Sequence, residues 1–587
     1  MENTLNYFDY GVIAFYFLFM VGIGVFFRNY ITNTSDYFRG GGQMVWWMAG
    51  SSAFMVQFSA WTFTGAASKA YEDGLLILVI FFGNALGFLA NYLYFAGKFR
   101  QTRVITAVDA MRQRFGKTSE QVFTWFQLPM GTLYAGIWLN GLGVFLAAVF
   151  GFDIETTILI TGTVVLILSV TGGSWAVVAS DFMQVLVLMP ISLVAAYFAL
   201  QEVGGAGELI ERFPADRLFG GGTNYSAVIW VWVVIILVKQ FASTNNLMDA
   251  SRYLCAKDTW HARRAALLAS ALFIIGPVVW FIPPMASAIL YPDLNSMFPQ
   301  LGEKGSEAAY VALCINVLPV GMLGLLLSGI FAATMSSMDS GLNRNAGIFV
   351  RNFYLPHLRP KAGEKELLFA GKISTLIFGA LIIAAGIYFS KMKDLPLFDL
   401  MMQFGGLVAI PMQVPLIWGI IVRRVPDWAS WASILVGLAT SFFVKTYLDS
   451  HWVNDFLGLE TEFSGREAKD IILIMAVSIN LLVGSVFYLS TMFFYKEPKD
   501  EARKVEIDTL FKNLDTPVVS SEEESEKGDA NQGASLGMLS LIYGGFVALL
   551  CLIPNPMTGR IAFLFCGGVL LLIGYLLRKD SKKSSAK

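Results

Sequence analysis

The chain of 587 residues is 56% apolar and only 14% charged, and its formal net charge is −1. Because a soluble domain carries about 25% charged residues, we expect most of this chain to be solvated by lipid. The charge balance lacks the basic excess of a nucleic-acid-binding protein, and the sequence holds no constellation of Ser, Cys or His residues that indicates an enzyme.

Apolar runs follow one another along the chain, and a membrane-spanning helix needs roughly 20 such residues. The first run has no small-residue cleavage site after it, so we interpret it as a retained helix and not as a signal peptide. The runs predict an all-α polytopic membrane protein with about 15 transmembrane helices. They lie at about 7–27, 46–68, 75–96, 120–149, 154–171, 176–199, 226–250, 264–290, 318–343, 367–389, 397–421, 429–447, 471–494, 536–555 and 561–577.

The charged residues between the runs predict the orientation of the chain. If the N-terminus lies outside, roughly 30 of the 42 Lys and Arg residues fall on the cytoplasmic side, in agreement with the positive-inside rule. An odd number of spans then places the basic tail, residues 578–587, in the cytoplasm.

The spacing of the runs also predicts the domain organisation. Residues 495–535 interrupt the apolar pattern and contain the sequence SSEEESEKGDANQGAS, which is typical of a flexible acidic linker on the cytoplasmic side. The other predicted parts are an N-terminal helix with a connector (1–45), a central core (46–425), two peripheral spans (426–494), two C-terminal spans (536–577) and the basic tail.

One apolar run, residues 329–343, carries a stripe of hydroxyl groups. Four of its residues recur at i, i+3, i+4 and i+7 and so share one helical face: Ala333, Ser336, Ser337 and Ser340. Asp339 lies one position off this face. An oxygen-only surface without nitrogen or sulfur favours a hard cation, whereas one or two hydroxyls alone would be explained as contacts between helices. We therefore predict a cation site here.

Three further segments place polar residues at membrane depth, where an unpaired charge is costly. The stretch 51–65 alternates small, polar and aromatic residues, which is compatible with an unwound helix whose carbonyls bind sodium or with a kinked structural helix. Asp181 follows a Gly-Gly pair within a span. Lys239 and Gln240 lie in the middle of another span, where the lysine requires either a structural acid or an anionic ligand.

Several motifs, in order along residues 7–450, resemble those of the sodium:solute symporter family. They are TSDYFRGGG (34–42), Trp46-Trp47, QFSA (57–60), Gly65, GGSWAVVASDFMQ (172–184), NLMDASR (246–252), ATMSSMDS (333–340) and GLVAIP (406–411). The resemblance implies a five-plus-five inverted repeat, as in the leucine-transporter fold, with one helix before the core and about four after it.

The resemblance further implies a function and its partners. The protein would import a small polar organic solute together with sodium ions, by alternating access, across a bacterial inner (plasma) membrane. It would need a lipid bilayer, no nucleic acid and no cofactor beyond sodium ions, and a monomer would be sufficient for transport.

Site residues are also implied by the resemblance. The main sodium site would consist of Met55, Phe58, Ala333, Ser336 and Ser337. A second site, present in some members, would use Asp181 and Ser340. This chain adds Asp339, where some members have serine or alanine, so the two carboxylates could form a pair that strengthens this site or binds a proton.

The solute pocket is predicted to differ from that of the family's bacterial galactose carrier, because the sugar-contacting positions differ almost throughout. A cationic, aromatic-lined pocket favours an anionic solute, such as a sugar acid or another carboxylate. The predicted solute contacts are Gln57, Trp61, Thr62, Asn84, Lys239, Gln240 and Gln403.

Other functions remain alternatives. Sodium/sugar or sodium/amino-acid symport would use the same fold. A membrane sensory domain is a further possibility, since some relatives of this fold are fused to signalling modules, but only a short tail follows the last span here. A channel would need a continuous polar lining, whereas the polar residues of this chain gather at one depth.

Overall fold

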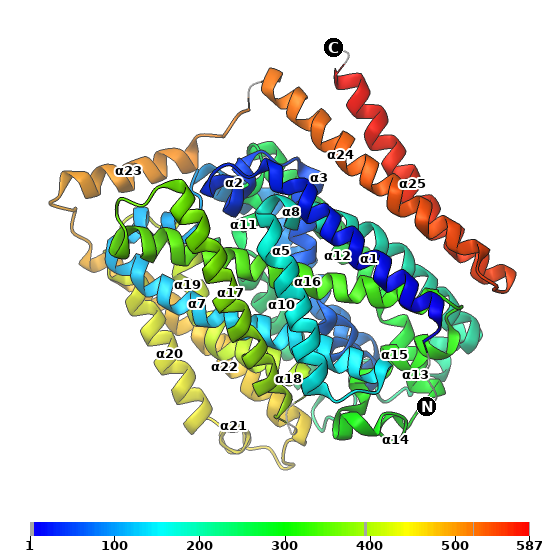
Figure 1. Cartoon of the computed structure of the whole chain (residues 1–587). Helices are drawn as coiled ribbons and strands as arrows, with labels where there is room; N and C mark the ends of the chain where they lie inside the picture. The colour runs from blue at the N-terminus through cyan, green and yellow to red at the C-terminus, as the bar shows by residue number, and fades with distance from the viewer. Residues whose placement is uncertain (1–4, 393–395, 521, 586–587) are drawn as a thin grey trace.

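The computed structural model describes residues 5–392, 396–520 and 522–585. In this part of the chain every regular element is a helix, and the one strand-like pairing is an isolated bridge between Met44 and Ala256. Helices satisfy their own backbone hydrogen bonds, as a lipid environment requires. Figure 1 shows the long helices lying side by side, with the two termini toward opposite ends of the molecule.

Thirteen helices among the described residues are long and apolar enough to cross a membrane. The prediction of an all-α polytopic membrane protein is confirmed, whereas the count of about 15 is not. Two predicted spans fall short: 46–68 is interrupted, because α3 (Trp46–Val56) ends after 11 residues, and 154–171 contributes only the shorter apolar helix Ile154–Ile167.

The core consists of two successive runs of five helices, and each run begins with a helix that breaks near its middle. The first run contains α3, η3 (Ala60–Phe63), α4 (Gly65–Asp73), η4 (Gly74–Ile77), α5 (Leu78–Ala90), the π-helical η5 (Asn91–Phe95), α6 (Ala96–Gln101), α7 (Ala107–Phe150) and α8 (Ile154–Val203). Gly173 has a φ of 54°, in the left-handed region that glycine tolerates, and there α8 divides into the fourth and fifth helices of the run.

The second run repeats this pattern. It contains α10 (Ser226–Thr244), η6 (Leu247–Ala250), α11 (Ser251–Cys255), α12 (Thr259–Trp280), α13 (Ile282–Leu290), α16 (Met322–Phe349), η8 (Val350–Leu358), α17 (Glu364–Ser390), α18 (Leu397–Phe404), the π-helical η9 (Gly405–Ala409) and α19 (Ile410–Trp418). The loop between α13 and α16 holds α14 (Leu294–Met297), η7 (Pro299–Ala308) and α15 (Ala309–Val317).

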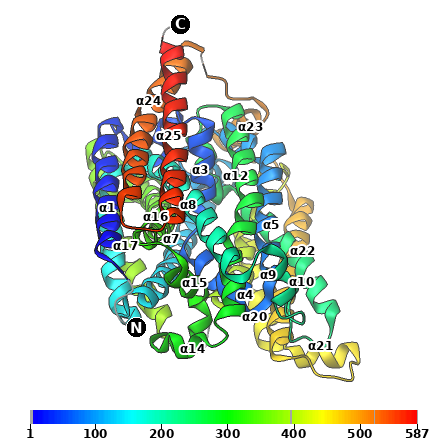
Figure 2. The same ribbon diagram turned by 90° about the vertical axis from the view of Figure 1, so that its right-hand side faces the viewer.

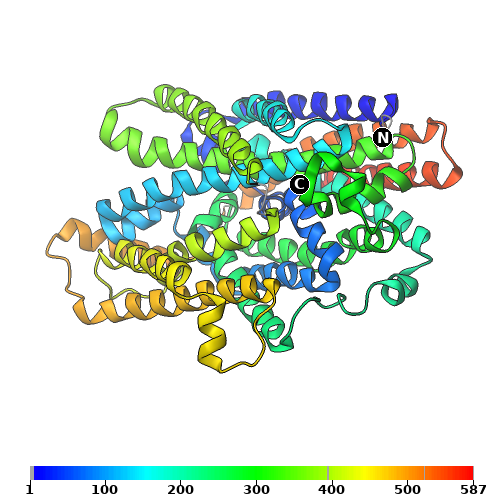
Figure 3. The same cartoon turned by 90° about the horizontal axis from the view of Figure 1, so that it is seen from below.

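The remaining elements surround the core. They are α1 (Tyr7–Phe27), η1 (Arg28–Tyr30), α2 (Thr34–Arg39), η2 (Gly40–Gly42), α9 (Ala206–Arg212), α20 (Ala429–Tyr447), α21 (Ser450–Leu457), α22 (Gly465–Ser490), η10 (Thr491–Phe494), α23 (Glu501–Asp515), α24 (Glu522–Leu549), η11 (Leu550–Leu552) and α25 (Met557–Ser585). The α24–α25 hairpin lies beside α1, on the edge of the molecule opposite to α20 and α22 (Figures 2 and 3).

Helix α1 braces the start of α16. Asp9 Oδ1 accepts a hydrogen bond from Gly324 N (2.7 Å), which satisfies one of the amide groups left open at the beginning of α16. A Cβ on Gly324 would lie 2.5 Å from the Asp9 carbonyl oxygen, so the two backbones are in direct contact. The helix that carries the hydroxyl stripe is therefore held from outside the core.

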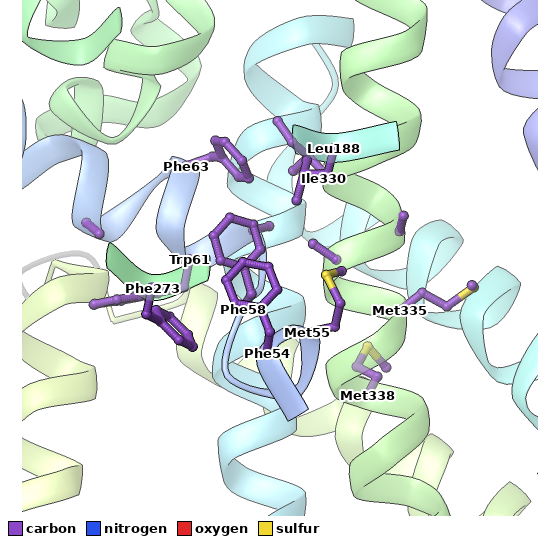
Figure 4. Packing of buried hydrophobic residues seen from close by; sticks show 14 of the residues in the cluster. Phe54, Met55, Phe58, Trp61, Phe63, Leu188, Phe273, Ile330, Met335 and Met338 are labelled. Carbon is purple, nitrogen blue, oxygen red and sulfur yellow. The ribbon is translucent and has the colours of Figure 1, made fainter. Parts of the chain in front are cut away.

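Aromatic rings fill the space around the break in the first core helix. The Phe58 ring centroid lies 4.3 Å from that of Trp280 and 5.5 Å from that of Phe63. Figure 4 shows these phenylalanine rings at the break, with Met335 and Met338 of α16 to one side. Because such buried rings pack at van der Waals contact, they fix the broken helix against α12 and α16.

The predicted flexible linker, residues 495–535, is instead largely helical. Helix α23 buries Ile507, Leu510 and Leu514, and α24 begins inside the acidic stretch. Residues 501–515 therefore form a packed helix within the predicted linker, and the flexibility of the linker stays a prediction. The three apolar residues recur at i, i+3 and i+7, the spacing of one helical face, whereas the low apolar content of the segment had suggested disorder.

Glu307 in η7 joins the α13–α16 loop to the core. Its buried carboxyl accepts a hydrogen bond from Leu397 N at the start of α18 (2.7 Å). Burial raises the pKa of the Glu307 carboxyl from 4.5 to about 7. Between these values the folded protein binds a proton that the unfolded chain releases. The stabilisation is therefore complete below pH 4.5 and is lost as the pH rises through about 7.

We predict that the melting temperature falls by a few degrees between mildly acidic and mildly basic pH, and that Glu307→Gln weakens this dependence. Glutamine keeps the acceptor for Leu397 N and removes the titration, which corresponds to up to about 3 kcal/mol of unfolding free energy. Differential scanning fluorimetry measures the effect, with Glu303→Gln at an exposed position of η7 as the control. An identical pH dependence in Glu307→Gln and wild type would contradict this assignment.

Candidate functional site

The first core helix is interrupted directly beside α16. Helix α3 ends at Val56, and Ser59, in an extended conformation, begins η3 by accepting a hydrogen bond from Trp61 N. Ala60 N donates to Thr334 Oγ1 on α16 (2.8 Å). Hydroxyl side chains thus replace backbone partners that an unbroken helix would supply, which permits the chain to unwind in a buried position.

Four backbone carbonyl oxygens surround the hydroxyl group of Ser337. Its Oγ lies 3.3 Å from the carbonyl oxygen of Met55, 3.4 Å from that of Val56, 2.7 Å from that of Phe58 and 3.3 Å from that of Ala333. The hydroxyl has a single hydrogen, which it donates to the nearest carbonyl, that of Phe58. The Met55 carbonyl also accepts from Phe58 N (3.0 Å), but each carbonyl oxygen has two lone pairs, so the cluster keeps oxygen lone pairs that a cation could use.

This cluster has the chemistry of a site for a hard monovalent cation. Its ligand atoms are all oxygen. Ser336, the preceding residue of α16, is fully buried, but no hydrogen bond joins its hydroxyl to this cluster. Among the described residues no group of three or more His, Cys, Asp or Glu side chains could hold a metal ion. Four of the five residues predicted for the main sodium site, Met55, Phe58, Ala333 and Ser337, lie together, with the Val56 carbonyl as an unpredicted member. Sodium binding there, and a part for Ser336 in it, stay predictions.

The residues predicted for a second sodium site are linked through an arginine that the sequence analysis did not single out. Asp181 accepts a hydrogen bond from Ser52, and Arg252 Nη2 lies 3.7 Å from Asp181 Oδ2. The same guanidinium donates to Ser340 Oγ. A cation at Asp181 would therefore compete with Arg252 for the carboxylate.

Asp339 does not join this group. Its Oδ1 accepts a hydrogen bond from Ser169 on α8, and no contact pairs it with Asp181 in the part of the chain that the structure describes. Successive residues of a helix point about 100° apart, so Asp339 and Ser340 face different neighbours. No hydrogen bond or ion pair joins Asp339 to Asp181, but the two carboxyl groups are near enough to interact electrostatically, so the predicted acidic pair stays a prediction.

A cavity of about 200 Å³ adjoins the break. Both broken helices, α5, α7 and the α18–α19 segment line it. Five of the predicted solute contacts face this cavity: Gln57, Trp61, Asn84, Lys239 and Gln240. Polar and aromatic residues that the prediction missed also face it, among them Ser59, Gln127, Tyr134, Trp138, Asp249 and Gln413.

Lys239 is the unusual member of this lining. Its Nζ donates to Gln240 Oε1 (3.3 Å), and Gln240 Nε2 in turn donates to Asn84 Oδ1 (2.6 Å). Lys239 forms no salt bridge with any described residue, so the structural acid considered as an alternative is not found there. Its ammonium lies against Gly405, where an added Cβ would be 3.2 Å from Nζ. A buried cation with one neutral partner favours an anionic ligand.

The structure does not bring Thr62 and Gln403 to the cavity. Side chains of successive residues in a 3₁₀ turn point about 120° apart, so Thr62 is buried elsewhere while Trp61 faces the cavity. On α18, Met401 and Met402 occupy the lining and Gln403 points away. The amide at this side of the cavity is that of Gln413, beyond the π-helical turn η9, which a sequence pattern of period 3.6 does not reveal.

A stack of two rings separates this cavity from a second one of about 310 Å³. Trp61 faces the first cavity and Phe398 the second, and their ring centroids lie 6.0 Å apart. Trp61 Nε1 also donates to Leu397 O (3.3 Å), and Lys69 Nζ lies 5.4 Å from the centre of the Phe398 ring. The cavity beside the break is therefore closed toward the end of the molecule that holds α14 (Figure 1).

Comparison with known proteins matches residues 37–437 to the sodium:solute symporter family. Among curated relatives, the sodium/glucose cotransporter 2 of Rattus norvegicus is 26% identical over 487 residues, covering 73% of this chain and 71% of the relative. The sodium/glucose cotransporter of Vibrio parahaemolyticus is 24% identical, with 76% and 86% covered. The human sodium/myo-inositol cotransporter 2 is 24% identical, with 88% and 80% covered.

Solved structures support the fold. A substrate-bound, outward-open Na⁺-coupled sialic acid symporter matches with a TM-score of 0.66 at 19% identity, covering 83% of this chain and 98% of that one. Mhp1, a nucleobase-cation-symport-1 family transporter in a closed conformation, matches with a TM-score of 0.50 at 13% identity, with 82% and 99% covered. The predicted leucine-transporter-like architecture is confirmed by these matches.

We predict that Ser337→Ala weakens sodium-dependent thermal stabilisation of the purified protein, raising the half-saturating sodium concentration about tenfold or more, because the hydroxyl at the centre of the carbonyl cluster is lost. Ser328→Ala is the matched control. Ser328 is buried on the same helix, but its hydroxyl donates to Gly324 O of its own helix (2.8 Å). Equal sodium dependence in both variants would exclude this cluster as the sodium site.

Proposed function

This chain belongs to the sodium:solute symporter family, and on that basis we propose that it imports a small polar organic solute, preferably a carboxylate or sugar acid, coupled to sodium. The observation that carries the proposal is the carbonyl cluster around Ser337, which opens beside the cavity containing Lys239. Sodium coupling follows from the family, and the relatives are transporters and not enzymes. The solute class and the site residues are our proposals.

The broken helix couples the two ligands. Met55 and Phe58 contribute carbonyls to the sodium cluster, while Gln57 and Trp61, within the same interruption, face the cavity. A sodium ion held by these carbonyls would fix the conformation of residues 55–61 and so order the solute-facing side chains. By thermodynamic linkage, the solute would increase sodium affinity by the same factor.

The driving force is the sodium gradient. Each sodium ion that moves inward contributes roughly 2.3 kcal/mol per 100 mV of membrane potential, in addition to its concentration term. A second ion at Asp181 and Ser340 would double this contribution, but it must first displace Arg252. We therefore propose that binding of the second ion includes a movement of the Arg252 guanidinium, with the protein acting as a monomer in a bacterial plasma membrane.

The preference for an anionic solute depends on Lys239. Its ammonium is buried, forms no salt bridge with a described residue, and lies beside amide and aromatic groups that can orient a small polar molecule. A carboxylate would supply the missing counter-charge. The matched structure of a sialic acid symporter shows that this fold can accommodate a sugar acid.

A neutral sugar or polyol is the second candidate. The curated relatives are named for glucose and myo-inositol, and the amide groups of Gln57, Asn84 and Gln240 at the cavity suit hydroxyl groups. In that case Lys239 would donate hydrogen bonds without requiring a charge on the solute.

To test the function, the purified protein is screened by thermal shift against sugars, polyols, sugar acids and amino acids, in sodium and in potassium chloride. We expect a carboxylate to stabilise the protein only in sodium. Its uptake into proteoliposomes should accumulate against its gradient when sodium is high outside, with a Hill coefficient for sodium above one. Uptake that proceeds equally in potassium would refute sodium coupling, and a Hill coefficient of one would refute the second ion.

We predict that Lys239→Met reduces the affinity for an anionic solute at least about tenfold, because one charge-assisted contact is lost. The same variant should leave sodium-induced stabilisation in the absence of solute within about twofold of wild type. Scintillation proximity binding and thermal shift measure the two quantities. If neutral sugars bind wild type best and Lys239→Met leaves their affinity unchanged, the sugar alternative replaces the carboxylate proposal.

A further inference from the structure

Residues 501–520, called the strap, comprise α23 and the segment that follows it, and they contact two different groups of core helices. In one group, the bundle, α12 packs against α3, α5 and α6. In the other, the scaffold, α7, α8, α16 and α17 pack against each other. The cavity that contains Lys239 lies between the groups, because α5 and both broken helices line one side of it and α7 the other. Figure 1 shows α23 at the end of the molecule opposite to α14.

The strap is firmly attached on the scaffold side. Arg503 makes a bidentate salt bridge with Asp427 (2.9 and 3.0 Å) and donates to Gln113 O on α7 (2.6 Å). Asp427 is itself held to α7, because Ser119 Oγ donates to its carbonyl oxygen (3.1 Å). The buried Arg114 of α7 fixes the preceding loop through three carbonyl groups, those of Gly419, Val422 and Arg423.

The attachment to the bundle is polar and exposed. Lys98 on α6 pairs with Asp515 (3.0 Å), whose side chain is 81% exposed. Arg103, just beyond α6, donates to Asn513 Oδ1 (2.8 Å) and to Thr516 O (3.3 Å). Arg103 is the one non-glycine residue in the described ranges with φ in the left-handed region (60°), so these bonds hold a backbone conformation that is normally avoided.

A short backbone bridge completes this attachment. At the start of α12, Thr259 N donates to Val518 O (3.1 Å), and Val518 N donates to Thr259 Oγ1 (2.9 Å). Ser520 Oγ donates to Asp258 Oδ2 (2.9 Å). The pair of Arg503 and Asp427 is bidentate, and its side chains are 12% and 43% exposed. The bundle contacts are single hydrogen bonds and one exposed ion pair, which are weaker, so the bundle end is the end that can be released.

We propose that the strap stabilises the arrangement seen here, in which the cavity is closed toward the α14 end, and that its bundle contacts at residues 513–520 must open each time the cavity opens to that end. The proposal rests on the proposed function, because alternating access requires the two helix groups to move relative to each other. Opening one end of the cavity brings the groups together or apart at the other end, where the strap joins them. Arg103 and Thr259 are thus positioning residues for the transport cycle.

Hydrogen–deuterium exchange on the full-length protein tests which end is released. We expect exchange at residues 513–520 and 257–260 to rise at least about threefold when sodium replaces potassium, while 501–508 stays unchanged. Exchange at 396–404, near the ring stack at the α14 end, should rise in parallel. A rise at 501–508 equal to that at 513–520 would overturn the asymmetry. No response to sodium at 396–404 in wild type would refute sodium coupling itself.

A reversible lock then tests the role of the bundle contacts. The double variant Val518→Cys/Thr259→Cys places two thiols where the backbones are already bonded, a spacing compatible with a disulfide. In the oxidised state the sodium response at 396–404 should disappear, and reduction should restore it. The single variants Val518→Cys and Thr259→Cys, treated with the same oxidant, should respond as wild type does. A full sodium response in the locked protein would overturn the proposal.

Discussion

The candidate site depends on carbonyl oxygens from the interrupted helix and from α16 that converge on one hydroxyl group. Four carbonyl oxygens lie within 3.4 Å of the Ser337 hydroxyl, which can donate to only one of them. In water such carbonyls would be solvated, but here they are buried among aromatic rings (Figure 4). A dehydrated cation would bind to the remaining lone pairs of these oxygens. The rest of the fold holds these oxygens together.

Each supporting element limits how the cluster can relax. The rings of Phe58 and Trp280 prevent the unwound segment from collapsing into the core, and Ala60 N is already bonded to Thr334. Helix α1 fixes the start of α16 through Asp9. The oxygens are therefore preorganised, so little free energy would be lost in ordering them when an ion binds. A cation bound to these oxygens would further restrict the rest of the interruption, which carries the cavity-facing Gln57 and Trp61.

The sequence predicted the fold class, four residues of the carbonyl cluster around Ser337, and five residues of the cavity, because these follow from helical periodicity and a family pattern. It failed where geometry departs from the regular helix. The π-helical turn η9 placed Gln413, not Gln403, at the cavity, and the 3₁₀ turn η3 directed Thr62 away. Arg252 was missed because a guanidinium at a helix end carries no sequence pattern that links it to Asp181 and Ser340. Likewise, α23 lies in a polar segment, and its three buried leucine and isoleucine side chains were too few to suggest a packed helix.

Gly405 affects both the charge and the size of the cavity, because it leaves room for the Lys239 side chain. Glycine leaves the Lys239 ammonium room to rest against the main chain of η9; a methyl group there would sit 3.0 Å from Lys239 Cε and 3.2 Å from Nζ. The Lys239 side chain would then have to move into the free volume of the cavity or leave the cavity. Exchanging one hydrogen for one methyl group at this position would thus alter the electrostatics and the capacity of the cavity together.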